Sequence, residues 1–191
     1  MEKVRIGFAM TGSFCTFAAA LEQLKQLAAD EKWDILPILS ENAYSMDTRF
    51  GTAQQTIETM ETLCGKEVVH TIPQAEPIGP KKMLDVLVVA PCTSNTLAKI
   101  ANGINDTPVT MAVKSHIRND KPVVLAVSTN DALAAAGRNI GQLMNQRNLF
   151  FVPMRQDDPV GKPRSVVADL TQLIPTVEAA LKGQQYQPIL L

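Results

Sequence analysis

Two hydrophobic patterns alternate along the chain. In the first, nearly every residue of a short run is apolar, which is typical of strands buried on both faces of a parallel sheet. In the second, apolar residues recur every three or four positions, as Phe17, Leu21 and Leu24 do, and this spacing predicts amphipathic helices. The continuous apolar runs cover residues 4–9, 33–39, 85–90, 122–127 and 149–152.

The regular alternation of these two patterns predicts the class of fold. Parallel strands need crossovers, and right-handed helical crossovers cover both faces of a sheet. We therefore expect an α/β fold: a single Rossmann-like (flavodoxin-like), open, mostly parallel sheet with helices on both faces. With 191 residues, of which 46% are hydrophobic, the chain can bury a real core but is short for two full domains, so residues 1–191 are interpreted as one domain.

Proline marks the less regular segments. Because Pro37 cannot donate to a ladder, we expect the strand at 33–39 to lie near an edge or an irregularity. The proline-rich segment 71–82 is expected to be a mobile surface loop, and residues 41–49 an irregular loop. The remaining expected elements are helices at 52–63 and 109–117, a helix with Leu133 and Met144 on its inner face, a last strand at 149–152, and a final helix at 166–181 that is kinked at Pro175.

Charge and hydropathy exclude several classes of function. The formal net charge is -1 and the 18 basic residues are scattered, so no basic stripe for nucleic acid is present. No run reaches the roughly 18 apolar residues that span a bilayer, and the N-terminus lacks the apolar region of a signal peptide. We expect a cytoplasmic protein that binds neither nucleic acid nor membrane.

Cysteines and histidines give no sign of a metal site. Cys15, Cys64 and Cys92 are far apart and lack CxxC spacing, which argues against a disulfide framework and structural zinc, so they are interpreted as small buried hydrophobic residues. His70 and His116 have no neighbouring ligand at useful spacing. No metal is therefore expected.

Polar residues follow four of the predicted strands. In an open α/β sheet, ligands bind beyond the carboxyl ends of the strands, so these positions are candidates for a binding site. They are the Thr-Gly-Ser turn after the first strand, Ser40 after the second, the segment PCTSNT after the central strand, and the segment 128–130. The candidate cofactor-binding residues are Thr11, Gly12, Ser13, Ser40, Pro91, Cys92, Thr93, Ser94, Asn95, Thr96, Ser128 and Asn130.

The first turn is suited to a phosphate. Gly12 lets the backbone approach a ligand, and the helix that follows offers unpaired N–H groups to an anion. Ser13 stands where a P-loop would have lysine, and GxGxxG is absent, so triphosphate hydrolysis and dinucleotide binding are both disfavoured. A mononucleotide such as FMN remains. Each hydroxyl taken alone could equally cap a helix.

The segments GFAMTGSFCTF and APCTSNTLAKIANGINDTPVT resemble a flavoprotein family that includes phosphopantothenoylcysteine decarboxylase, peptidyl-cysteine decarboxylases and flavin prenyltransferases. The second segment is similar to that family's PASANT signature. The resemblance implies that Gly12, Ser13 and Ser40 hold the FMN phosphate, and that the segment 93–95 lines the flavin and helps to bind substrate. It also implies a homo-oligomer, a trimer or a multiple of trimers.

Two departures from the family pattern bear on the reaction. The decarboxylases carry a catalytic histidine shortly before the central strand, where this chain reads AEPIGPKKMLD. Their PxMNxxMW motif is reduced to VSTNDAL, which keeps Asn130, and their glycine-rich substrate clamp has become PVGKPRSV. Cysteine decarboxylation is therefore disfavoured. No catalytic residue is assigned.

Among relatives that lack this histidine, the chain resembles the branch that supports dipicolinate formation in the mother cell of spore-forming bacteria. This resemblance implies an oxidoreductase component that acts on a small dicarboxylate at the dihydrodipicolinate level, together with the NADPH-linked A subunit of dipicolinate synthase, which binds NADP. Lys114, Arg118, Arg155, Lys162 and Arg164 are candidate cations for that substrate. Two alternatives stay open: an FMN-binding scaffold without its own catalysis, and a diverged flavin-dependent decarboxylase or prenyltransferase.

Overall fold

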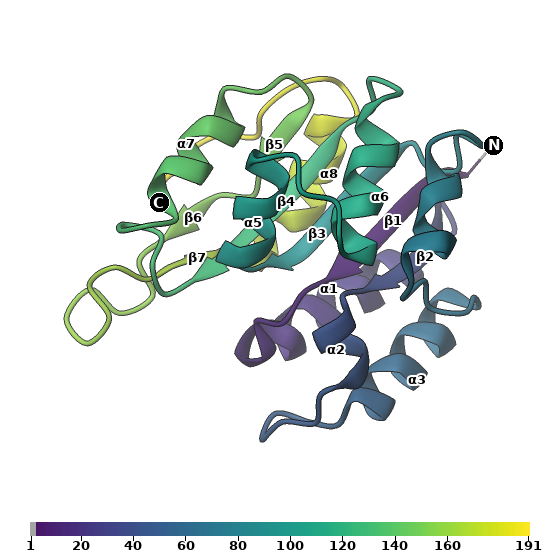
Figure 1. Cartoon of the computed structure of the whole chain (residues 1–191), viewed down its shortest axis with the longest axis horizontal. Helices are drawn as coiled ribbons and strands as arrows, with labels where there is room; N and C mark the ends of the chain where they lie inside the picture. The colour runs from purple at the N-terminus through teal and green to yellow at the C-terminus, as the bar shows by residue number, and fades with distance from the viewer. Residues whose placement is uncertain (1–2) are drawn as a thin grey trace.

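A sheet of seven strands forms the centre of the molecule (Figure 1), in a computed structural model that describes residues 3–191. Its order is β2-β1-β3-β4-β7-β6, with β5 beside the first half of β4. The pairs among β1 to β5 are parallel, whereas β7 is antiparallel to β4 and β6. The predicted open, mostly parallel α/β sheet is confirmed. The strands are β1 (Val4–Met10), β2 (Trp33–Leu39), β3 (Val86–Cys92), β4 (Val123–Thr129), β5 (Leu149–Phe151), β6 (Met154–Arg155) and β7 (Val166–Ala168).

Helices cover both faces of this sheet and enclose two separate cores. The first core lies under α1 (Phe17–Ala28), α3 (Ala53–Cys64) and α8 (Leu173–Ala180). The second lies under α5 (Ser94–Ala101), α6 (Pro108–Ile117) and α7 (Gly137–Met144). Shorter elements complete the chain: α2 (Glu41–Ser45), α4 (Ile72–Ala75), and the 3-10 turns η1 (Phe14–Thr16), η2 (Glu76–Ile78) and η3 (Leu170–Gln172).

The central strand β3 shows why a continuous apolar run is needed. Successive side chains of a strand point to opposite faces. Val86 and Val88 accordingly belong to the first core, while Leu87 and Val89 belong to the second. Every residue of β3 is buried, so a polar residue at any of these positions would face one core or the other.

Pro37 occupies the edge strand that its chemistry requires. Strand β2 is the last strand of the sheet on its side, and its outer edge meets the backbone of Val69. The N–H of Leu39 donates outward to the carbonyl of Val69 at 2.9 Å, and the carbonyl of Pro37 accepts from the N–H of Val69 at 2.9 Å. Because Pro37 and Leu39 are two residues apart, the missing N–H of Pro37 would also point outward, and no β1–β2 bond is lost.

The prediction of a mobile loop at 71–82 is wrong. Thr71 caps α4 in a capping box with Gln74, and η2 continues the helical course, with Ile78 fully buried. The side chain of Ser115 donates to the carbonyl of Glu76 at 3.0 Å, which fixes this segment against α6. The physical reason is that proline is tolerated at helix starts, where the Thr-x-x-Gln pattern of residues 71–74 forms the capping box.

Three further expectations need correction. The segment 41–49 is not wholly irregular, because Ser40 caps the short helix α2. The helix expected around 133–144 begins only at Gly137, and Leu133 and Met144 are exposed rather than facing inward. The sheet does not end at 152, since the short antiparallel strands β6 and β7 follow β5.

The expected final helix also begins later than predicted. Residues Val166–Ala168 form β7, and Asp169 then caps η3 by accepting from the N–H of Thr171 at 3.1 Å. Pro175 lies in the first turn of α8, where backbone N–H groups have no intrahelical acceptor, so no kink is required there. Within residues 3–191, none of the helices combines the length and the apolar character needed to cross a membrane.

Candidate functional site

Two adjoining compartments open at the carboxyl ends of the central strands, and they share a wall made by Gly12, Thr93 and Ser94. The Ser40 compartment, of about 330 Å³, lies on the side of α2 and α5. The Ser128 compartment, of about 640 Å³, lies between the start of α1, the end of β4 and the segment 157–167. The polar ends of the predicted strands therefore meet at one edge of the sheet, as expected for an open α/β fold.

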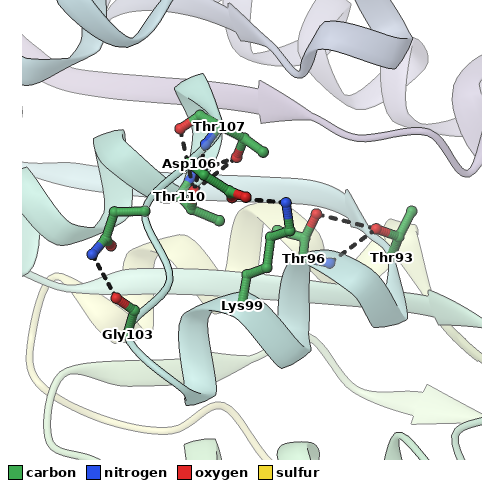
Figure 2. Close-up of polar contacts among 8 residues, drawn as sticks. Thr93, Thr96, Lys99, Gly103, Asp106, Thr107 and Thr110 are labelled. Atoms are coloured by element: carbon green, nitrogen blue, oxygen red, sulfur yellow. Dashed lines mark hydrogen bonds and ion pairs between the residues drawn. The ribbon is translucent and has the colours of Figure 1, made fainter.

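The Ser40 compartment combines helix starts with one ion pair. Ser40 caps α2, its hydroxyl accepting from the N–H of Ala43 at 3.4 Å. Lys99, on α5, extends to Asp106 with 2.7 Å between Nζ and Oδ1, as Figure 2 shows. The hydrogen bond from Lys99 holds the pKa of Asp106 below its ordinary value, so this carboxylate is charged at neutral pH. Asn95 is exposed at the mouth of this compartment.

Three hydroxyl groups gather in the Ser128 compartment. The hydroxyl of Ser128 lies 2.8 Å from that of Ser13 and 2.8 Å from that of Thr16, and Ser13 and Thr16 are 3.3 Å apart. These residues come from the end of β4 and from the turn that leads into α1. Neither Ser13 nor Thr16 makes a side-chain capping bond to the helix that follows it. Their hydroxyls bond to one another and to Ser128, and they can turn to donate to an anion by giving up these mutual bonds rather than a helix cap.

The shared wall depends on Thr11, a residue that is 1% exposed. Its hydroxyl donates to the carbonyl of Pro91 at 2.8 Å and accepts from the N–H of Thr93 at 3.0 Å. Thr93 in turn caps α5, with 3.3 Å from its hydroxyl to the N–H of Thr96. The turn that carries Gly12 and the start of α5 are thus joined through the Thr11 hydroxyl.

The structure divides the residues predicted for the FMN phosphate. Gly12 belongs to both compartments, but Ser13 faces the Ser128 compartment and Ser40 faces the other. Gly12 has no side chain between them, and a Cβ there would meet Phe14 at 3.5 Å and Asn42 at 3.7 Å. These are ordinary contacts, so packing within the protein does not demand glycine. Of these two neighbours, Asn42 lines the Ser40 compartment and Phe14 lines neither compartment, so a Cβ at Gly12 would lie on the Ser40 side of the shared wall.

The remaining predicted residues fall into two groups. Thr93, Ser94 and Thr96 line the Ser40 compartment together with Thr11 and Asn95, and Ser128 and Asn130 line the other. Pro91 and Cys92 are buried within β3 and line neither compartment. Burial raises the pKa of the Cys92 thiol well above its ordinary value, so this thiol is a neutral packing group.

Of the five candidate cations, only Lys162 lines the Ser128 compartment, where its Nζ lies 3.2 Å from Oδ2 of Asp157. Arg118 follows α6, close to Gly79, and so lies toward the starts of the strands. Lys114, Arg155 and Arg164 line neither compartment. The interpretation of Cys15 as a buried residue is wrong, because it is exposed at the Ser128 compartment.

Several lining residues were not predicted from the sequence. They reach the site from segments that showed no signal of their own or from positions next to a predicted residue. Asn42 and Thr16 lie two and three residues beyond Ser40 and Ser13, so extending each polar strand end by one turn would have found them. The others are Glu41, Cys15, Ala19, Lys99, Thr107, Asp157, Ser165, Val166 and Val167.

Comparison with known sequences places this site in a family. The model of the family described as Flavoprotein matches residues 1–174. The B subunit of dipicolinate synthase from Bacillus subtilis (strain 168) is 47% identical over 187 residues, which cover 98% of this chain and 93% of the relative. The predicted resemblance to the branch that supports dipicolinate formation is confirmed.

Solved structures agree with this placement. The B subunit of dipicolinate synthase from Bacillus halodurans C is 41% identical with a TM-score of 0.90, and the match covers 100% of this chain and 98% of that one. DmrB from Burkholderia xenovorans, solved in complex with FMN as a cubic protein cage for redox transfer, has a TM-score of 0.67 at 20% identity and covers 94% of this chain and 96% of its own. The second likeness concerns the fold. The family match and the two dipicolinate synthase relatives together show that the chain belongs to the flavoprotein family.

Proposed function

We propose that this chain supports the formation of dipicolinate, pyridine-2,6-dicarboxylate, from a dihydrodipicolinate-level precursor, together with the NADPH-linked A subunit of dipicolinate synthase. The observation that carries this proposal is the 47% identity to the B subunit of a dipicolinate synthase across 98% of the chain. The proposed setting is the cytoplasm of the mother cell of a spore-forming bacterium. NADP would be bound by the NADPH-linked subunit.

We infer that the cofactor of this chain is FMN, bound across Gly12. A single ligand that contacts both Ser13 and Ser40 must cross the shared wall, and the absence of a side chain at Gly12 leaves that path open. The hydroxyls of Ser13 and Thr16 and the start of α1 suit the phosphate, because they donate to an anion without first breaking a helix cap. Ser94 and Asn95 would lie beside the flavin.

When bound, FMN supplies a ring that can exchange two electrons. The contribution of this chain would be binding and orientation. Lys162 would pair with a carboxylate of the substrate in place of Asp157, since it is the one lysine or arginine among the described residues that line the Ser128 compartment. We further propose a homo-oligomer, a trimer or a multiple of trimers, which the cage formed by DmrB supports as a mode of assembly for this fold.

The direct experiment mixes the purified chain with the NADPH-linked subunit, NADP(H) and the precursor, and follows dipicolinate formation against the same mixture without this chain. We expect a higher rate in the full mixture. An unchanged rate with a confirmed complex would overturn the proposal. Release of carbon dioxide from a peptidyl-cysteine substrate, or a prenylated flavin, would instead favour the decarboxylase or prenyltransferase alternative.

A pair of substitutions separates a working site from a scaffold. Ser94→Ala with Asn95→Ala removes polar groups from the cleft at the start of α5. Asn102→Ala, at the other end of the same helix and outside both compartments, is the matched control. If the double variant assembles with the NADPH-linked subunit yet keeps the full rate, the chain is a scaffold. A loss of rate in the double variant alone supports a working site.

A further inference from the structure

The regular backbone hydrogen bonding between β1 and β3 ends where the two strands reach the site. Regular pairing runs from Ile6 opposite Val86 to Ala9 opposite Val89. Beyond this point β3 contains Pro91, which has no N–H to donate. The register between β3 and β4 also shifts between Val89 and Cys92. Backbone hydrogen bonds of the sheet alone therefore do not hold the segment that leads into Thr93 and Ser94 of the shared wall.

Beyond the regular pairing, the side chain of Thr11 makes hydrogen bonds between the two segments. Both the backbone N–H and the hydroxyl of Thr11 donate to the carbonyl of Pro91, at 3.2 and 2.8 Å. The same hydroxyl accepts the N–H of Thr93 at 3.0 Å, where a backbone carbonyl would serve in a continuing ladder. A threonine hydroxyl has a single proton, and here that proton is committed to Pro91. Thr11 is therefore not placed to donate to a cofactor.

We propose that Thr11 is a positioning residue, which holds the amide of Thr93 and so fixes the wall shared by the two compartments. The path of the effect is short. Thr93 caps α5 and immediately precedes Ser94, while Gly12 immediately follows Thr11. The distance between Gly12 and Ser94, which bound both compartments, is set by the backbone bond from Thr11 to Pro91 together with this hydroxyl, which alone reaches the amide of Thr93. Ligand contacts on the two sides of the wall accordingly depend on it together.

Isosteric substitution isolates this role. Thr11→Val keeps the shape of the side chain but loses the donor to Pro91 and the acceptor for Thr93, both in a buried position. Thr11→Ser keeps both. Thr176→Val is the matched control, because Thr176 is likewise fully buried and its hydroxyl donates to the carbonyl of Gln172 at 2.6 Å within the last helix, away from the site.

The primary readout is hydrogen exchange of the Thr93 amide by NMR in the full chain without added ligand. We expect slow exchange in the wild type and in Thr11→Ser, and exchange about 2- to 13-fold faster in Thr11→Val, as the loss of one net hydrogen bond predicts. Thr176→Val should leave the Thr93 amide slow at a comparable loss of stability. Fast exchange of this amide in the folded wild type, or equal protection in Thr11→Val, would overturn the assignment.

FMN titration gives a second readout, which rests on the proposed cofactor. Thr11→Val should bind FMN about tenfold or more weakly, with Thr11→Ser and Thr176→Val close to wild type. An equal loss of FMN affinity in Thr11→Val and Thr176→Val would mean that Thr11 contributes only to general stability, and would contradict its role as a positioning residue. If the wild type takes up no FMN, the cofactor proposal fails, and the Thr93 amide decides the role of Thr11 by itself. If Thr11→Val does not fold, the wild type and Thr11→Ser still decide, since both must protect this amide.

Discussion

Gly12→Ala tests whether a ligand crosses the wall between the two compartments. The added methyl would lie 3.5 Å from Cε2 of Phe14 and 3.7 Å from Cβ of Asn42, both within ordinary van der Waals range. Gly12 is also not among the described glycines with positive φ. The folded chain can therefore accept alanine. Its stability should stay the same or rise by up to about 1 kcal/mol, because alanine narrows the unfolded ensemble.

FMN binding, unlike stability, should weaken in Gly12→Ala. The methyl would take up space beside Asn42, on the Ser40 side of the wall that one ligand must cross to reach both Ser13 and Ser40. Forcing a methyl group into a filled space costs about 1–3 kcal/mol, which corresponds to a Kd for FMN raised roughly 5- to 150-fold. Quenching of FMN fluorescence during titration measures the Kd, and thermal unfolding without FMN measures the stability.

Two glycines serve as controls for this substitution. A Cβ at Gly141, in α7, meets no atom within 4 Å, so Gly141→Ala should leave FMN binding unchanged and stabilise the helix slightly. A Cβ at Gly7 would lie 2.6 Å from Leu84 and 2.7 Å from Leu87, so Gly7→Ala should lower stability by about 1–3 kcal/mol. A Gly12→Ala protein that is folded and binds FMN like the wild type would refute the crossing path.

Three further predictions concern stability. Gly79→Ala should be strongly destabilising in thermal unfolding, because its Cβ would overlap the backbone carbonyl of Ser115; an unchanged Tm would contradict the packing of η2 on α6. Hydrogen bonds from Arg5 lower the pKa of Asp85, so this pair stabilises the fold above the unfolded pKa and the contribution disappears as acid protonates Asp85; Asp85→Asn should cost about 1–2 kcal/mol at pH 7 and less in acid. Burial lowers the pKa of His116 to about 4, so on acidification the unfolded chain takes up this proton before the folded chain does, and the free energy of unfolding should fall between about pH 6.5 and 4. Urea unfolding at several pH values should show a smaller fall for His116→Gln. An equal fall in both proteins would argue against a buried neutral imidazole.

The sheet could be predicted from the sequence because a strand that is buried on both faces appears as a continuous run of apolar residues. Strand β3 contains only buried residues, so its apolar run has no competing interpretation. The proline-rich segment 71–82 is not a loop because Pro73 and Pro77 lie at helix starts, where proline is tolerated. The buried Ile78 and the bond from Ser115 to Glu76 show that the segment packs on α6. Strands of two or three residues such as β6 and β7 carry too little pattern to be recognised.

The sequence predicts which strand ends carry the candidate site, but it does not predict how the residues at those ends are arranged around it. Ser13 and Ser40 both follow strands, and nothing in their spacing indicates that Gly12 stands between two compartments. Thr11 lines the Ser40 compartment, so its binding to a cofactor stays a prediction, but nothing in the sequence indicates that its hydroxyl also joins Pro91 to Thr93. Side-chain partners across 80 residues of sequence are set by the folded sheet, and a single sequence does not reveal them.

The visible absorption spectrum of the natively purified protein tests the central claim most directly. If the cleft across Gly12 holds FMN, the protein should carry a flavin band, or acquire one that remains with the protein through gel filtration after FMN is added. A colourless protein that does not retain added FMN would contradict the assignment of this cleft to a flavin.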